Sequence, residues 1–267
     1  MLKKIKNSIS NPKLIFMNLK DSWKYIFGYI FLMTFILTIP AILASIVNQN
    51  MFFVNNTKIA SGINENFINK NIKIENGILQ NNNMNVAFGI GDHVFVIGDI
   101  PITASGYITV FDYDKITFYL SAGSNINIKL ASKNYQELNL MNLEFEVNNT
   151  NLLVAKTKEV MTLKKNVVIP LKILGIYFSY FVDYLLITLT LAVVAMLFKK
   201  APLDFSGHYK INTYVMTSWT ITNLILILFG LTSLYYLSII IAYIYQVITY
   251  RSVRAIKVII PKDRNNE

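Results

Sequence analysis

The sequence predicts an integral membrane protein, α-helical with four transmembrane helices, and with an extracytoplasmic β-rich (α+β) domain inserted between the first and second helices. Two observations support this fold class. Hydrophobic residues make up 54% of the 267-residue chain and charged residues only 15%, whereas charged residues are roughly 25% of soluble domains. The hydrophobic residues also gather into long uncharged runs near the N-terminus and in the C-terminal part, as membrane spans require.

The first predicted span covers residues 25–47, a run of 23 residues without a charged side chain. At about 1.5 Å per residue, a helix of this length crosses a hydrocarbon core of about 30 Å. A cleaved signal peptide is the alternative, but the apolar part of such peptides is typically about 7–15 residues long. We therefore expect an uncleaved anchor. Pro40 lacks a backbone N–H, so it should bend the last turns of this helix.

Three further spans are predicted in the C-terminal part. The second covers residues 167–198 and includes Pro170, whose fixed φ suits a first helical turn. The third (213–231) and the fourth (234–250) are separated by two residues, so we expect a helical hairpin. Nine aromatic residues fall close to predicted span ends, as interfacial anchors do: Trp23, Tyr25, Tyr29, Tyr177, Tyr180, Trp219, Tyr235, Tyr236 and Tyr250.

The distribution of charge predicts the orientation of the chain. Residues 1–24, 199–212 and 251–267 together carry fourteen lysines and arginines but only four acidic residues. Because positive charge is enriched on the cytosolic side of membrane proteins, we expect these three segments in the cytosol of a bacterium. Residues 48–166 would then lie outside its cytoplasmic membrane. The positive charge thus reflects topology and contact with anionic lipids of the bilayer, and we expect no nucleic-acid partner.

Residues 1–24 allow two interpretations. Asn11 and Pro12 have the residue types of an N-cap and a first helical position, and an apolar segment follows them. This pattern predicts a short helix lying in the membrane interface. A basic tail without structure is the alternative, since both satisfy the same charge count.

Residues 48–166 have a different composition, with short segments of alternating apolar residues broken by Gly, Asn and Asp. This pattern predicts six or seven β-strands, together with a helix near residues 63–69. The domain is long enough to bury a core of its own. The alternating segments include Ile72 to Ile74, Val94 to Ile97, Ile108 to Leu120, Ile126 to Leu130 and Leu143 to Val147.

Asp112 and Asp114 form the one carboxylate pair that suggests a cation site. At a spacing of two, both side chains would lie on the same face of a strand, and carboxylate oxygens are the ligands of hard cations. The alternative, which we favour, is a solvent-facing pair with Tyr113 buried between them. A pair without further ligands at a defined spacing is a weak motif, so we expect no metal.

The remaining polar motifs do not indicate catalysis. The segment from Gly89 to His93 contains two glycines, but a strand rather than a helix follows it, so we expect a turn and not a phosphate loop. His93 has no serine or second base in a recognisable frame. His208 has no companion ligand and is expected at the surface. The chain has no cysteine and no HExxH, GxSxG or Walker motif, so we expect neither an enzyme nor a cofactor.

Three polar residues lie within the predicted spans: Asp183 in the second, Asn223 in the third and Gln246 in the fourth. Such residues are costly in a membrane, and an acid there suggests function by default. Their depths differ: Asp183 falls in the outer third, Asn223 near the middle and Gln246 in the inner third. Facing inward, they would line a polar path. Otherwise they make hydrogen bonds between helices, or Asp183 extends to the surface.

The chain resembles a bacterial membrane-protein family known as domain of unknown function 1189, some members of which are labelled maltodextrin utilisation proteins. The matching stretches are residues 7–42, with Ile-Pro near the end of the first span, residues 67–80 with their Asn-Gly turn, and VFDYD at 110–114. Residues 205–220 resemble the start of the third span, although Thr217 to Trp219 depart from the expected Ala-Leu-Thr-Pro-like run. The resemblance implies four spans, one extracytoplasmic domain and a link to carbohydrate uptake, and it brings no catalytic residues.

The sequence leaves three classes of function open. The leading hypothesis is a non-enzymatic accessory, sensor or scaffold protein, whose outer domain binds a ligand or a partner such as a membrane transporter complex or a cell-wall component. The competing hypothesis is a small transporter or channel that uses Asp183, Asn223 and Gln246. A membrane enzyme would need a metal at Asp112 and Asp114.

Overall fold

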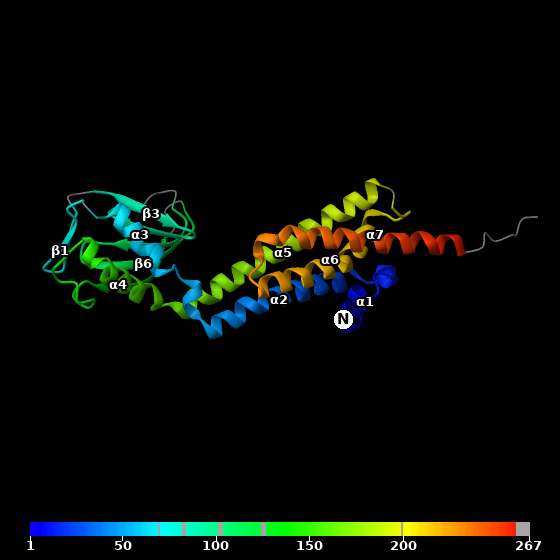
Figure 1. Ribbon diagram of the computed structural model, residues 1–267, viewed down its shortest axis with the longest axis horizontal. Coiled ribbons are helices and arrows are strands. Elements are labelled where there is room, and N and C mark those ends of the chain that lie inside the picture. Colours follow the sequence, from blue (N-terminus) through cyan, green and yellow to red (C-terminus); the bar gives the residue numbers. More distant parts are fainter. Residues whose placement is uncertain (69, 82–83, 101–103, 124–126, 199, 260–267) are drawn as a thin grey trace, which may run out of the picture. The chain divides into compact units, whose positions relative to one another are not determined.

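The computed structural model describes the chain apart from residues 69, 82–83, 101–103, 124–126, 199 and 260–267. The chain forms two compact units. One contains Met1–Ala44 and Lys172–Glu267, and the other contains Ser45–Leu171. The first is a helical bundle and the second is the inserted α+β domain (Figure 1).

Among the described residues, four helices are long and apolar enough to cross a membrane. They are α2 (Trp23–Val47), α5 (Lys165–Leu197), α6 (Phe205–Leu228) and α7 (Tyr235–Ile259). The α+β region lies between the first and the second of them in sequence. Helices of this kind suggest a multi-pass membrane protein, in agreement with the predicted fold class.

Helices α6 and α7 differ most from the predicted spans. Helix α6 begins at Phe205 rather than at residue 213, because the Asp204 carboxylate caps it by accepting a hydrogen bond from the Gly207 backbone N–H at 2.8 Å. Helix α7 continues past residue 250 to Ile259. Hydropathy predicted only the apolar part of each helix. Polar residues such as His208 are also helical, but they lie outside the apolar run and were therefore not included in the predicted span.

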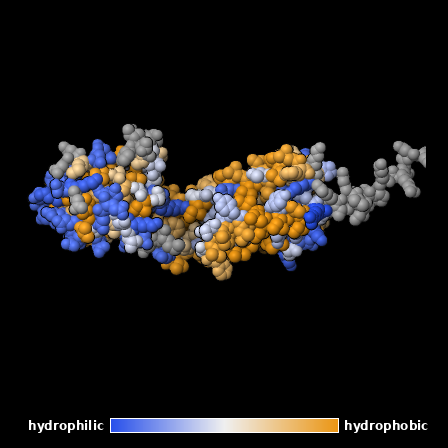
Figure 2. Space-filling view, turned by 45° about the horizontal axis from the view of Figure 1, so that its top comes forward, coloured by the Kyte–Doolittle hydropathy of each residue, from blue (hydrophilic) through white to orange (hydrophobic). Residues whose placement is uncertain are grey.

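The bundle surface is apolar along its sides. In α2 the exposed side chains recur every four residues, which places them on one face of the helix. They are Phe27, Phe31, Phe35, Ile39 and Leu43. Figure 2 shows the hydrophobic surface that such side chains create over the bundle. An apolar surface that follows a helix from end to end suits contact with lipid.

The N-terminal segment is folded. Helix α1 (Leu2–Ser10) and the 3₁₀ helix η1 (Pro12–Lys20) both pack against α6, and η1 also packs against α7. Ile15 is fully buried there. The segment is therefore helical rather than an unstructured tail, whereas its position in the membrane interface stays a prediction. Pro12 opens η1 as expected, but Asn11 makes no capping hydrogen bond through its side chain. The segment is instead tied down by the Lys4 ammonium, which lies 2.5 Å from the Asp21 carboxylate.

The inserted domain contains two sheets in its described residues. The smaller has the strand order β2-β1-β8 and the larger has the order β3-β4-β5-β6-β7. All neighbouring strands are antiparallel except β4 and β5, which are parallel. The strands are β1 (Lys73–Glu75), β2 (Ile78–Gln80), β3 (Val86–Ile90), β4 (His93–Ile97), β5 (Gly106–Phe111), β6 (Lys115–Ser121), β7 (Asn127–Asn134) and β8 (Leu143–Glu144).

Two helices, α3 (Asn56–Asn66) and α4 (Thr150–Thr162), pack on the larger sheet. Aromatic side chains fill the space between them, with the Phe67 ring 5.0 Å from Phe88 and 5.7 Å from Phe111. Helix α3 lies earlier than the predicted helix at 63–69, because the Asn55 side chain caps it by accepting from the Thr57 N–H.

The predicted β-rich domain is present, but the number of strands and the end of the last strand differ from the prediction. The described residues form eight strands rather than six or seven. Residue 147, expected in the last strand, begins the 3₁₀ helix η3 (Val147–Asn149) instead. Helix α4, which follows at once, was not predicted. Residue 126 of the predicted fourth segment lies outside the described residues.

Candidate functional site

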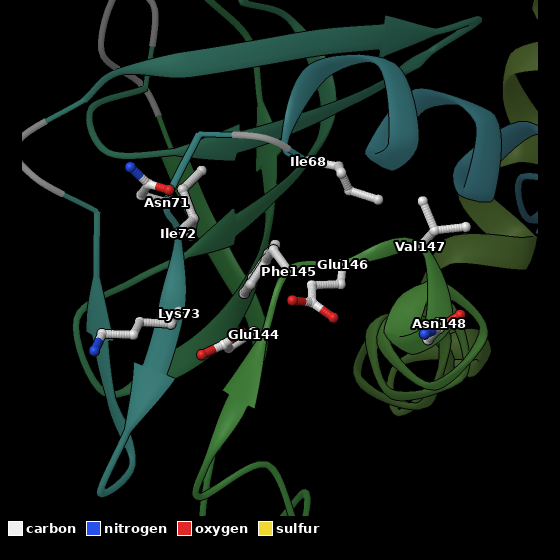
Figure 3. Close-up of a pocket in the computed structure, with 9 residues that line it drawn as sticks. All are labelled: Ile68, Asn71, Ile72, Lys73, Glu144, Phe145, Glu146, Val147 and Asn148. Carbon is white, nitrogen blue, oxygen red and sulfur yellow. The ribbon is translucent and has the colours of Figure 1, made fainter.

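The inserted domain carries a groove with a volume of about 590 Å³. It lies where the β1–β8 pair meets the end of α3 and the start of η3 (Figure 3). This volume is within the range of about 300–1,000 Å³ that is usual for ligand sites. The lining residues are Ile68, Asn71, Ile72, Lys73, Glu144, Phe145, Glu146, Val147 and Asn148.

The floor of the groove is apolar and fixed. Ile68, Ile72 and Phe145 are all buried. The Phe145 N–H donates to the Ile72 carbonyl at 3.0 Å, which continues the β1–β8 pairing by one residue. The Phe145 ring also lies 6.3 Å from the ring of Phe67, so the floor rests on the aromatic core of the domain. A rigid apolar floor of this kind is preorganised for binding.

The rim of the groove is polar and rich in acceptors. Glu144 and Glu146 are both exposed, and they lie on either side of the buried Phe145 (Figure 3). Lys73 faces Glu144 across the strand pair, and its ammonium is 3.2 Å from the Glu75 carboxylate. Two carboxylates beside one paired lysine favour a ligand with hydrogen-bond donors or positive charge.

The groove was not predicted from the sequence. Residues 143–147 alternate between apolar and acidic side chains, and Phe145 is buried between the exposed Glu144 and Glu146, but Val147 is 65% exposed. The pattern did not indicate that the chain leaves the sheet after Glu144 and turns into η3. That departure, together with the proximity of α3, creates the hollow.

The predicted turn between Gly89 and His93 is present. It joins β3 to β4, with Gly91 at a positive φ of 62°, a conformation that suits glycine. His93 is buried, its Nδ1 lies 2.8 Å from the Asp92 carboxylate, and its ring stacks on that of Tyr107 with centroids 5.1 Å apart. These contacts give His93 a place in the core packing.

Asp112 and Asp114 lie at the tight turn between β5 and β6. Asp112 accepts a hydrogen bond from the Thr117 hydroxyl at 2.5 Å, and Asp114 lies 3.1 Å from the Lys115 ammonium. The hydrogen bond to Asp114 raises the pKa of Lys115. Tyr113 is 69% exposed rather than buried between the acids, because the turn points it outward. Within the described residues, no group of three or more His, Cys, Asp or Glu is placed to hold a metal ion.

The bundle contains a polar cluster formed by Lys200, His208, Asn212, Gln246 and Tyr250. The Gln246 amide nitrogen donates to the Leu191 carbonyl at 2.7 Å and to the Asn212 side-chain oxygen at 2.8 Å. Its oxygen accepts from the Lys200 ammonium at 3.0 Å. Gln246 therefore connects α5, α6 and α7 by hydrogen bonds, as the structural interpretation of this residue anticipated.

The same cluster corrects the expectation for His208. Its side chain was expected at the surface but is 1% exposed, with Nδ1 2.7 Å from the Tyr250 hydroxyl. Asn212 also donates to that hydroxyl, at 3.3 Å. The reason is the early start of α6, which places His208 in a helical turn that packs against α7 rather than in a loop.

The three polar residues of the predicted spans do not contact one another through hydrogen bonds. Asp183 on α5 is partly buried and interacts electrostatically with Tyr180 and Tyr235. Asn223 on α6 is 3% exposed, and its amide nitrogen has no hydrogen-bond partner within the described part of the chain. No hydrogen bond joins any two of Asp183, Asn223 and Gln246 among the described residues, and Gln246 belongs to the polar cluster.

The aromatic residues expected at the membrane interface divide into three groups, of which one is partly buried: Tyr25, Tyr177, Tyr180 and Tyr235. Trp23 and Tyr236 are exposed, as anchors are. Tyr29, Trp219 and Tyr250 are buried within the bundle instead, and the Tyr29 hydroxyl lies 2.6 Å from that of Thr217. These residues were predicted as anchors from their position near the end of an apolar run. That position does not indicate whether a side chain lies on the buried or on the exposed face of its helix.

Comparison with known proteins adds one match. The family model described as "Protein of unknown function (DUF1189)" matches residues 2–250. No curated protein and no solved structure matches the chain. The match includes the bundle and the inserted domain with its groove, so both are part of what the family model describes.

Proposed function

Because the chain belongs to the DUF1189 family, whose description assigns no activity, we propose a function from the groove. In this proposal the protein is a non-enzymatic accessory, sensor or scaffold protein of a bacterial cytoplasmic membrane. The inserted domain lies outside the membrane and binds a ligand or a partner protein. The bundle anchors it there or connects it to a transporter complex.

The groove is the observation that carries this proposal. It combines a buried apolar floor, formed by Ile68, Ile72 and Phe145, with the exposed carboxylates of Glu144 and Glu146. An apolar floor with a few polar groups at the rim is the usual composition of a binding site. The occupant we propose has an apolar part that contacts the floor and donor groups that reach the two glutamates.

Photocrosslinking in intact cells tests this proposal. A photoreactive residue replaces Val147, which lines the groove and is 65% exposed. In the matched control it replaces Tyr113, which is 69% exposed at the β5–β6 turn of the same domain. We expect a crosslinked partner from position 147 and not from position 113, identified by mass spectrometry.

Specificity for the groove is tested by charge reversal. Glu146→Lys should abolish the crosslink from position 147, whereas Glu137→Lys, at an exposed site that does not line the groove, should preserve it. Equal crosslinking from positions 147 and 113, or a crosslink that survives Glu146→Lys, would contradict binding in the groove. Since the family resemblance implies a link to carbohydrate uptake, which we include in the proposal, maltodextrins are the first soluble ligands to test as competitors.

A second candidate is a small transporter or channel. The observation in its favour is the buried Asn223 amide nitrogen without a partner in the described residues, since such a group is costly within a membrane. This candidate predicts pH-dependent flux of solute in liposomes that contain the purified protein. If Asp183→Asn has unchanged flux, the carboxyl group of Asp183 is not needed for transport, and this candidate loses its ionisable group.

A further inference from the structure

A second, smaller hollow lies in the bundle. It has a volume of about 120 Å³ and is lined by Lys200, Val247, Tyr250 and Arg251. Two of these four residues are cations and none is acidic. At this size the hollow is smaller than the roughly 300–1,000 Å³ of sites for drug-sized molecules, so it suits a small anionic group rather than a large ligand.

The polar cluster holds one of the two cations in position. Lys200 donates to the Gln246 oxygen at 3.0 Å and lies over the Tyr243 ring, 4.6 Å from its centroid. Gln246 is itself held by Leu191 and Asn212. A lysine positioned in this way loses less side-chain entropy when it binds an anion than a mobile surface lysine does.

Arg251 is the second cation of the hollow, and Tyr250 forms part of its wall. The Tyr250 hydroxyl is bonded to His208 and to Asn212, which fixes this wall. Arg251, the next residue, is exposed. Its guanidinium carries several N–H donors in a planar fork that matches the oxygens of a phosphate.

Both cations lie where an apolar helix segment ends. Lys200 closely follows the apolar end of α5 at Leu197, and Arg251 follows the uncharged stretch of α7 that begins at Tyr235. In membrane proteins, lysines and arginines at such positions lie at the level of the lipid headgroups. An anionic phosphate is the group that is most abundant there.

We propose that this hollow is a phosphate-binding site in which Lys200 and Arg251 bind the anion and Gln246 positions Lys200. The phosphate belongs to a lipid headgroup or is free in solution. The site lies in the bundle, and it is independent of the groove of the inserted domain and of the function proposed for that groove.

The test uses the full-length protein in a neutral detergent and a buffer without phosphate. Two probes are titrated separately by calorimetry: inorganic phosphate, and phosphatidylglycerol in mixed micelles. Diacylglycerol with the same acyl chains is the control ligand without phosphate. The variants are Arg251→Gln and Lys200→Gln. Lys20→Gln is the matched control, because it removes one charge from an exposed position in η1 that does not line the hollow.

We expect saturable binding of at least one phosphate probe by the wild-type protein and by Lys20→Gln. Arg251→Gln and Lys200→Gln should each bind about tenfold more weakly, the effect of one lost charge-assisted hydrogen bond. Arg251→Gln is the decisive variant, since its exposed side chain makes folding insensitive to the change. Binding of phosphatidylglycerol alone identifies a headgroup site, and equal binding of both probes identifies a site for phosphate itself.

Three results would overturn the proposal. The first is the absence of saturable binding of both phosphate probes. The second is binding of diacylglycerol as tight as that of phosphatidylglycerol, which would indicate contact with acyl chains only. The third is equal affinity of Arg251→Gln and Lys20→Gln, which would indicate a general effect of positive charge.

Discussion

The bundle and the inserted domain differ in the side chains that they expose and in the polar side chains that they bury. The core of the inserted domain is built from phenylalanines such as Phe67 and Phe118, and the side chains at the rim of its groove are charged. The bundle exposes phenylalanines such as Phe35 and buries Asn212 and Gln246. This difference suits a bundle in contact with lipid and a domain in contact with water. Water favours an apolar core, whereas lipid leaves polar contacts to join the helices.

The largest effect is expected in the apolar core of the inserted domain. Phe67→Ala should lower the free energy of unfolding of this domain by about 3–5 kcal/mol, because it removes a fully buried ring and leaves a cavity. The loss is measured by titrating the full-length protein with denaturant and recording the protease resistance of the inserted domain at each concentration. Tyr113→Ala, at an exposed aromatic residue of the same domain, should change the stability by less than about 0.5 kcal/mol. Equal losses would contradict the assignment of the core.

The outer face of the bundle gives the next effect. Phe35 is 50% exposed in the middle of α2. Phe35→Asp should disfavour membrane insertion of this helix by about 2.5–3.5 kcal/mol, the cost of an acid at the centre of a span. The fraction of protein recovered in the membrane measures it. Tyr113→Asp should leave that fraction unchanged, and an equal effect of both would show that the two surfaces do not differ in solvent.

The buried polar contacts of the bundle should have an intermediate effect. Gln246→Leu removes the bonds to Lys200, Leu191 and Asn212 and leaves buried acceptors unpaired. We expect a loss of about 1–3 kcal/mol in the stability of the bundle, measured by thermal unfolding in detergent. Thr190→Leu, on the exposed face of α5, is the matched control and should be nearly neutral. A gain in stability from Gln246→Leu would show that apolar packing suffices inside the bundle.

The smallest effect is expected at the surface of the inserted domain. Hydrogen bonds from Lys133 and then from Lys156 lower the pKa of Glu159. A lowered pKa contributes stability above the ordinary glutamate value of about 4.5, and this contribution disappears as the pH falls through the pKa of the folded state. Glu159→Gln should therefore cost less than about 1 kcal/mol at pH near 7 and nothing once the pH lies well below the pKa of Glu159 in the folded state. If the melting temperatures of the wild-type protein and Glu159→Gln still differ in acid, the effect does not come from the charge of Glu159.

Local sequence signals predicted the elements better than the contacts between them. The helix expected at residues 25–47 was predicted correctly, since α2 covers Trp23–Val47, because an uncharged run of that length has few alternatives to a helix. Helix α4 was missed although Leu153, Val154, Thr157, Val160 and Met161 are buried at helical spacing, since the strand pattern before it was extended too far. The partners of Gln246 lie on α5, on α6 and just after α5. No pattern within one helix can reveal such contacts, and the groove depends in the same way on segments distant in sequence.

Single-cysteine labelling tests the central claim most directly, that one chain presents one surface to lipid and another to water outside the cell. The chain contains no cysteine, so each introduced thiol reports alone. With a membrane-impermeant maleimide, Tyr113→Cys should react in intact cells, Lys20→Cys only after permeabilisation, and Phe35→Cys under neither condition. Labelling of Phe35→Cys at the rate of Tyr113→Cys, or labelling of Lys20→Cys in intact cells, would contradict the account.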